Sequence, residues 1–127
     1  MLLEAETERI IGCFFRVYNS LGYGFLEKVY LNAMALELTE HRFSVIPQHP
    51  IHVFYKNVVV GDYFADLVVD DHIIVELKAA ESLRQEHIAQ LTNYLKATRK
   101  QVGLLLNFGR KPEFQRLVYT KGAFEVD

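Results

Sequence analysis

The sequence contains very little cysteine and no long apolar run, and both absences narrow the possibilities. Cys13 is the only cysteine, which excludes an intrachain disulfide and a zinc site built from cysteines and fits a reducing compartment. No apolar run approaches the ~18–20 residues of a membrane-spanning helix, and the N-terminus lacks the basic start and apolar core of a signal peptide. These absences predict a cytoplasmic protein without membrane contact.

An excess of charge of one sign is also lacking. The formal net charge is −2, so the chain has no overall basic signature of a nucleic-acid-binding protein. The distribution is uneven, because residues 1–83 contain 6 basic and 12 acidic residues, whereas residues 84–127 contain 8 and 4. This asymmetry fits a polyanion that approaches the C-terminal part while the acidic part holds a cation, although solvated faces of uneven charge are equally common.

Several motifs of known chemistry are missing. The sequence has no G-x-S-x-G nucleophile motif, no P-loop and no dinucleotide-binding fingerprint. Cys13 lies among apolar residues of an expected helix, which argues against a reactive thiol. His41, His49, His52 and His72 show no spacing typical of metal ligands. Acyl transfer and nucleotide-dependent chemistry are therefore disfavoured.

What is present predicts one packed domain over residues 1–127. Half of the residues are hydrophobic and 24% are charged, and the chain shows no repeat, linker or low-complexity segment. Hydrophobic periodicity predicts helices at 3–20, 25–40 and 83–99, and strands at 43–55, 58–69, 72–79, 102–108 and 115–119. Turns are expected at Lys56-Asn57 and Asp70-Asp71. The strands at 72–79 and 102–108, joined through a helix, are expected to pair in parallel. The order α-α-β-β-β-α-β-β indicates an α/β sandwich.

The second expected helix should bury one apolar stripe. Residues three and four apart share a helical face. The stripe consists of Leu26, Val29, Tyr30, Ala33, Met34 and Leu38.

Three charged residues interrupt the apolar strands. Glu76 and Lys78 are two residues apart, so they lie on the same face of their strand. The turn at Asp70-Asp71 should bring Asp66 back beside Glu76. Buried charges are costly unless they are paired or bind a metal, and two carboxylates favour a hard cation such as Mg²⁺ or Mn²⁺. The alternative from spacing alone is a structural ion pair of Lys78 with Glu76, with Asp66 exposed.

Three motifs in order resemble those of the PD-(D/E)XK nuclease superfamily. Asp66, Glu76 and Lys78 form D-x9-E-x-K, and Gln90-Leu-Thr-Asn-Tyr94 is similar to the Q-x3-Y motif of its RecB-type branch. Upstream, Gly24-Phe-Leu-Glu27-Lys-Val-Tyr30 matches G-x-x-E-x-x-Y, the signature of the GxxExxY family. The likeness covers about residues 7–119. One departure is Ala65, which stands where the superfamily name has proline, and it removes no ligand.

The resemblance implies a restriction-endonuclease-like fold, with a mixed central sheet flanked by helices, and a set of metal ligands. Asp66 and Glu76 would bind the cation together with the main-chain carbonyl of Leu77, and Glu27 would act directly or through water. Glu27 also lies in the first turn of its expected helix, where a carboxylate complements the helix dipole.

It also implies roles around the reacting phosphate. Lys78 would position or activate the attacking water, while Gln90 and Tyr94 would steady the lysine or contact the phosphate. His87 shares their helical stripe and is a candidate substrate contact, although a lone helical histidine is more often structural. A basic approach to the nucleic-acid backbone is expected from Arg84, Lys96, Arg99, Lys100, Arg110 and Lys111.

The leading hypothesis is a Mg²⁺- or Mn²⁺-dependent nuclease that hydrolyses nucleic acid, with DNA as the expected substrate. The alternatives are a non-catalytic module that binds nucleic acid or a protein on a nuclease-like fold, and a hydrolase of another phosphoester. Because one site cuts one strand, cleavage of a duplex would call for a homodimer.

Overall fold

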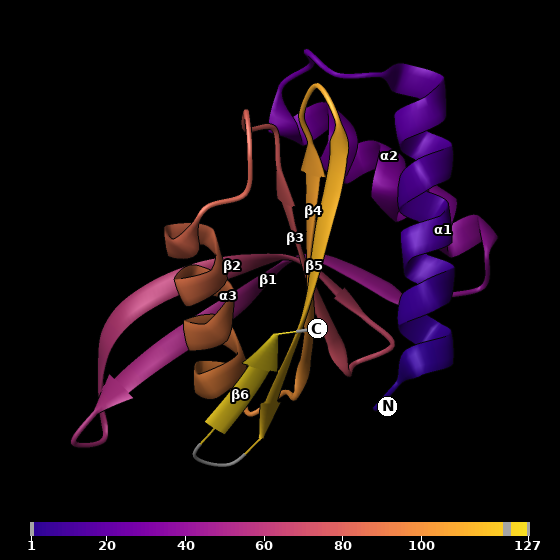
Figure 1. Cartoon of the computed structure of the whole chain (residues 1–127). Coiled ribbons are helices and arrows are strands. Elements are labelled where there is room, and N and C mark those ends of the chain that lie inside the picture. The colour runs from indigo at the N-terminus through magenta and orange to yellow at the C-terminus, as the bar shows by residue number, and fades with distance from the viewer. Residues whose placement is uncertain (1, 121–122, 127) are drawn as a thin grey trace.

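The computed structural model describes residues 2–120 and 123–126, which form one six-stranded sheet with helices on both faces (Figure 1). In chain order the elements are α1 (Glu4–Leu21), α2 (Glu27–Glu40), β1 (Val45–Tyr55), β2 (Val58–Val69), β3 (Ile73–Lys78), α3 (Gln85–Thr98), β4 (Val102–Phe108), β5 (Pro112–Thr120) and β6 (Ala123–Val126). The predicted α/β sandwich and the order of its first eight elements are confirmed. β6 was not predicted, because four residues are too few for strand alternation to be recognised.

The order of the strands in the sheet follows their order in the chain, from β1 to β6. β3 and β4 are parallel, as predicted, and α3 makes the connection between them. Every other neighbouring pair is antiparallel. The turns at Lys56-Asn57 and Asp70-Asp71 have positive φ at both residues. Lys56-Asn57 forms a two-residue hairpin loop, for which this conformation matches the strand twist, whereas His72 also belongs to the loop between β2 and β3.

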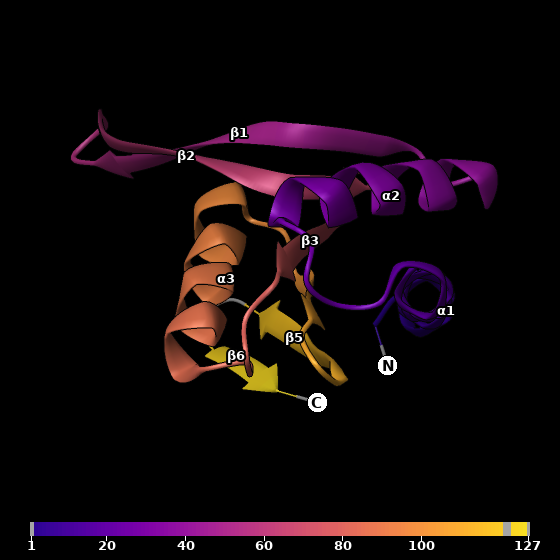
Figure 2. The ribbon, with the colours of Figure 1, turned by 90° about the horizontal axis from the view of Figure 1, so that it is seen from above.

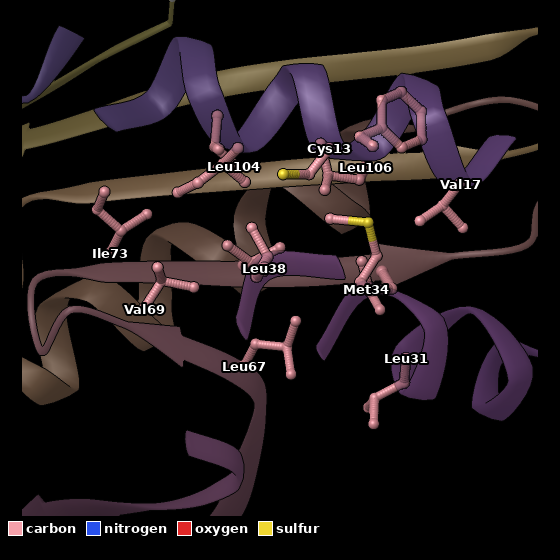
Figure 3. Close-up of a cluster of buried hydrophobic side chains, with 14 of the residues drawn as sticks. Cys13, Val17, Leu31, Met34, Leu38, Leu67, Val69, Ile73, Leu104 and Leu106 are labelled. Carbon is pink, nitrogen blue, oxygen red and sulfur yellow. The ribbon is translucent and has the colours of Figure 1, made fainter. Parts of the chain in front are cut away.

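The two faces of the sheet carry separate cores. α1 and α2 cover one face, where Cys13, Met34, Leu38, Leu104 and Leu106 pack together (Figure 3). α3 covers the opposite face with a smaller cluster that includes Leu91, Leu95 and Ile74. Since side chains alternate along a strand, Glu76 and Lys78 lie on the face of Ile74, toward α3.

The buried stripe of α2 differs from the prediction. Tyr30, Met34 and Leu38 are buried as expected, and Leu31 joins them. The prediction that Leu26 is buried is wrong, because Leu26 is the N-cap residue before the first helical turn and is 81% exposed. Val29 is also exposed. The helix is rotated so that its stripe begins at Tyr30, which leaves Val29 at the edge of the contact.

The β1–β2 hairpin extends beyond the rest of the sheet and past α3 (Figure 2). We call residues 52–64 the outer hairpin. Its exposed large apolar side chains are Phe54, Tyr55, Val58, Val59, Val60, Tyr63 and Phe64. The strand register shifts between Val53, which is opposite Gly61, and Phe54, which is opposite Val59. Beyond Phe64, β2 enters the core, and Ala65 and Leu67–Val69 are buried.

Within residues 2–120 and 123–126, no helix has the length and apolarity required to cross a membrane.

Candidate active site

Asp66 lies where β2 is not paired in either neighbouring ladder. The register between β2 and β3 begins with Leu67 opposite Val75 and does not extend to Asp66. On the other side, the register with β1 passes over Asp66 and over Gln48, whose φ is 53°. Buried main-chain groups need partners, so the main chain around Asp66 must find its hydrogen bonds elsewhere.

Two side chain to main chain hydrogen bonds replace the missing ladder. The main-chain N–H of Asp66 donates to Oε2 of Glu76 at 2.8 Å, and the N–H of Leu77 donates to Oδ2 of Asp66 at 2.8 Å. The carboxyl groups of Asp66 and Glu76 are thus fixed against β2 and β3, as their spacing across the hairpin predicts. Among the described residues, no other hydrogen bond reaches Oδ1 of Asp66 or Oε1 of Glu76.

Burial and neighbouring negative charge disfavour the ionisation of both carboxyl groups. Glu76 is only 4% exposed, and its burial, followed by the negative charge of Asp66, raises its pKa to about 8. Burial also raises the pKa of Asp66, and the charge of Glu27 adds to this, although the N–H of Leu77 opposes it. Water-poor surroundings and a like charge both stabilise the protonated form. A cation between these groups would relieve both causes.

Lys78 is held from α3. Its Nζ donates a hydrogen bond to Oε1 of Gln90 at 3.1 Å. Within the described residues no ion pair joins Lys78 to Glu76, and Asp66 is half-buried, so the structural ion pair considered from spacing is not formed. Lys78 is close enough for its charge to lower the pKa of both carboxyl groups. The amino group is therefore positioned beside the carboxylates without being neutralised by contact with them.

Tyr94 follows Gln90 by one helical turn and is buried. Burial, and then the charges of Glu76 and Asp66, raise its pKa to about 12. Its ring centroid lies 5.6 Å from that of Tyr63 on β2. The hydroxyl of Tyr94 consequently stays protonated at neutral pH and is a hydrogen-bond donor near the carboxyl groups.

The segment before α2 is fixed by Tyr30. The Tyr30 hydroxyl donates to the carbonyl of Gly22 at 2.7 Å and accepts from the N–H of Phe25 at 3.1 Å. Its ring stacks on Phe108, with centroids 4.1 Å apart. Gly24 has a φ of 110°, which a residue with a Cβ adopts only with strain. The glycine and tyrosine of the G-x-x-E-x-x-Y motif therefore determine where α2 begins.

Glu27 is the first residue of α2 and is exposed. Its charge raises the pKa of Asp66 and of Glu76, so it lies in their electrostatic neighbourhood. The three carboxylates nevertheless do not form a compact group with oxygens all within 4.8 Å of one another. This placement agrees better with a contact through water than with direct ligation.

The one compact group of three metal-ligating side chains among the described residues lies elsewhere. Cys13 on α1 and Glu37 and His41 on α2 bring ligand atoms within 4.8 Å of one another. The sequence spacing around His41 did not indicate this group, because its members are divided between two helices. Glu37 already pairs with His41 at 3.2 Å, and burial raises the pKa of the Cys13 thiol, in keeping with an unreactive cysteine.

His87 and Arg84 lie at the start of α3. Arg84 is the exposed N-cap residue, and its main-chain N–H donates to Nδ1 of His87 at 3.0 Å. His87 therefore has a structural partner in this turn, and its Nε2 is the nitrogen left for a substrate. The structure places both residues on the same helix as Gln90, three or more residues ahead of it.

The sequence did not indicate the group that holds the loop between β3 and α3. Asn107 is fully buried and lies beside Lys78 in the parallel register. It accepts from the N–H of Ala80 at 2.9 Å and donates to the carbonyl of Ala80 at 3.0 Å and to Glu113 at 3.1 Å. The available signal was an asparagine inside an otherwise apolar strand.

Gly109 completes this loop packing. A Cβ on Gly109 would lie 2.5 Å from the carbonyl oxygen of Ala80, so only glycine allows the two loops to approach so closely.

One family comparison identifies the superfamily of the chain. A family model described as the PD-(D/E)XK nuclease superfamily matches residues 4–117, which include every candidate site residue described above. Comparisons with curated proteins and with solved structures gave no match. The matched span, the mixed sheet and the paired carboxyl groups at the end of its hairpin agree with one another. The chain belongs to the PD-(D/E)XK nuclease superfamily.

Proposed function

We propose that this protein is a nuclease of the GxxExxY type that depends on Mg²⁺ or Mn²⁺ and hydrolyses phosphodiester bonds in nucleic acid, with DNA as the first substrate to test. Membership of the superfamily supports a nuclease-like function. The observation that carries the proposal is the fixed pair of Asp66 and Glu76, whose pKa values are both raised. Lys78 lies beside this pair and is held by its hydrogen bond to Gln90.

The donors at this site fit a hard divalent cation. Each carboxyl group accepts an internal hydrogen bond with one oxygen, and its other oxygen is available to bind a cation. The N–H and C=O of a strand residue point to the same side, so the carbonyl of Leu77 is directed toward Asp66 as its N–H is. Oxygen donors with room for water suit Mg²⁺ and Mn²⁺. Glu27 would contribute through an intervening water.

The chain's own residues suit phosphodiester hydrolysis. A bound divalent cation lowers the pKa of water and neutralises charge that develops on phosphate. Lys78 would orient the attacking water and add positive charge to the same phosphate. Gln90 fixes the lysine by accepting one of its protons in a hydrogen bond. Tyr94, with its pKa near 12, would donate a hydrogen bond to a phosphate oxygen.

The beginning of α3 supplies the proposed contacts to the rest of the backbone. Arg84 is exposed and charged, and Nε2 of His87 is free of the contact that engages Nδ1. Both would bind phosphates next to the one that is cut, which gives affinity without reading the base sequence.

The test is hydrolysis of labelled single-stranded DNA, duplex DNA and RNA in the presence of Mg²⁺ or Mn²⁺. We expect cleavage that EDTA abolishes and that Lys78→Ala reduces by at least about a hundredfold. Absence of cleavage of all three substrates would refute the proposal. Cleavage that survives both Lys78→Ala and Glu76→Ala would identify a contaminating enzyme.

One observation favours a second candidate, a module that binds nucleic acid or protein without catalysis. The carboxylate of Glu27 does not close a compact three-carboxylate group with Asp66 and Glu76. Titration calorimetry with Mn²⁺ separates the candidates. An enzyme should bind Mn²⁺ in a manner that Asp66→Asn abolishes, whereas a retained scaffold would give the same titration before and after this substitution.

A further inference from the structure

A groove of about 950 Å³ lies between the outer hairpin and α3. We call it the hairpin groove. Figure 2 shows the two elements that form it, with β1 and β2 passing beside the helix. Its aromatic side chains are Phe54, Tyr63 and Tyr94, and its basic side chains are Lys96 and Arg99.

The hairpin groove shares two of its lining residues with the candidate active site. Gln90 and Tyr94 line the groove. Gln90 also holds Lys78 through its 3.1 Å hydrogen bond, and Tyr94 experiences the charges of Asp66 and Glu76. A long ligand in the groove would therefore reach the pair of carboxyl groups at one end.

The hairpin offers exposed rings to this groove. Phe54 is 63% exposed and Tyr63 is 48% exposed. His52 approaches Phe54 edge-on, with ring centroids 6.4 Å apart. Exposed rings that line a groove are the surfaces on which unpaired bases stack, and this stacking does not depend on base identity.

Helix α3 supplies positive charge to the groove. Lys96 and Arg99 are exposed at the C-terminal end of α3, while the acidic Glu86 lines the groove at the N-terminal end. Asp62 is engaged by Nδ1 of His52 at 2.7 Å. The groove thus combines the cations of α3 with the exposed rings of the hairpin, as does a site that binds phosphates and bases together.

We propose that the hairpin groove binds an unpaired strand of nucleic acid and leads it to Asp66 and Glu76, so that the substrate is a single strand or a single-stranded segment. This inference rests on the proposed nuclease function. In a duplex the faces of the bases are stacked on one another, so the rings of Phe54 and Tyr63 would have no base to accept. A single strand uses both the rings and the cations.

The binding experiment uses fluorescence anisotropy in EDTA, where the strand is not cut. A labelled strand of about 12 nucleotides is compared with the duplex of the same length. We expect the single strand to bind at least about tenfold more tightly, and Phe54→Ala to weaken its binding roughly tenfold, as loss of one stacked base does. Tyr55→Ala is the matched control, because Tyr55 is the next residue, is 64% exposed and does not line the groove.

A second pair of variants tests the charges. Removal of one phosphate contact to a single strand reduces the slope of log Kd against log salt concentration by about 0.7. We expect this reduction for Lys96→Gln. Lys56→Gln, on an exposed residue at the hairpin tip that does not line the groove, should leave the slope unchanged.

Three results would overturn the inference. Equal affinity for duplex and single strand would do so, as would equal effects of Phe54→Ala and Tyr55→Ala. A dimer in light scattering that Phe54→Ala dissociates would instead identify the groove as an interface between two copies. Failure of hydrolysis with Mn²⁺, while Phe54-dependent binding of the single strand persists, would refute the nuclease function and support the groove.

Discussion

The two halves of the β1–β2 hairpin have the same secondary structure and opposite surroundings. The outer hairpin exposes Phe54, Tyr55 and Phe64 to solvent, although they are large and apolar. A few residues further along β2, the ionisable Asp66 is half-buried beside the buried Glu76. Apolar residues outside and acidic residues inside reverse the usual preference of these side chains. Such reversals mark positions selected for binding or chemistry rather than for stability.

The largest expected effect is on hydrolysis at the pair of carboxyl groups, Asp66 and Glu76. Lys78→Met should reduce hydrolysis by about a thousandfold, because the charge beside the carboxyl groups is lost. Lys56→Met, at the tip of the outer hairpin, should leave the rate within about twofold. Single-turnover rates with Mn²⁺ measure both variants. Equal losses would show that the comparison of the two halves is wrong for catalysis.

The next effect concerns packing. Leu67→Ala removes a fully buried side chain on β2 and should lower the free energy of unfolding by ~2–5 kcal/mol. Phe64→Ala, three residues earlier on the same strand and exposed, should change it by less than about 0.5 kcal/mol. Urea unfolding followed by circular dichroism gives both values. A large loss with Phe64→Ala would mean that the outer hairpin contributes to the fold.

The third prediction uses the pKa of Glu76, about 8 in the folded protein against 4.5 normally. Below pH ~4 the carboxyl group is protonated in both states, so it costs nothing. As pH rises from about 4.5 to 8, the unfolded chain loses this proton while the folded state still holds it, so stability falls, and the loss levels off above the folded pKa. In EDTA, Glu76→Gln should therefore raise the free energy of unfolding by roughly 4–5 kcal/mol at pH 9 and leave it nearly unchanged at pH 4.

Thermal unfolding across this pH range measures the difference between Glu76→Gln and the wild-type protein. The exposed Glu86→Gln is the control, for which a flat difference is expected. A wild-type protein as stable as Glu76→Gln at pH 9 would show that the surroundings do not raise the pKa of Glu76.

The smallest effect concerns the loop between β3 and α3. Asn107→Leu keeps the side chain's size but removes its hydrogen bonds to Ala80 and Glu113. Unfolding should become easier by about 1–2 kcal/mol because main-chain groups lose their partners. Hydrogen exchange should increase at Ala80 and Leu83 more than in the outer hairpin. Unchanged exchange in the loop would contradict this role of Asn107.

The parts of the fold that the sequence predicted depend on local pattern. The hairpin at Asp70-Asp71 brings Asp66 back toward Glu76, as predicted. Its register was not predictable from the turn, because a two-residue loop would place Asp66 opposite Val75, whereas the observed loop also includes His72. The apolar run of β4 and the helix before it predict a parallel neighbour for β3. Leu26 was misjudged because helical spacing was extended across the helix boundary.

What the sequence could not predict depends on contacts between distant segments. Asn107 holds Ala80 only because β3 and β4 are parallel in one particular register. The hairpin groove arises because the outer hairpin and α3, more than twenty residues apart in the chain, pass one another in space. Neither Phe54 nor Lys96 belongs to a sequence motif, so only the folded structure shows that they line the same groove.

The agreement between strand order and chain order has a consequence for how the protein folds. Each strand can join the edge of the sheet as soon as it is made, and only the step from β3 to β4 must close a longer loop through α3. Loop closure limits the rate when contacts are distant in sequence. The slow step of folding is therefore expected to coincide with the docking of Gln90 over Lys78, so that a chain arrested before β4 has both carboxyl groups but no positioned lysine.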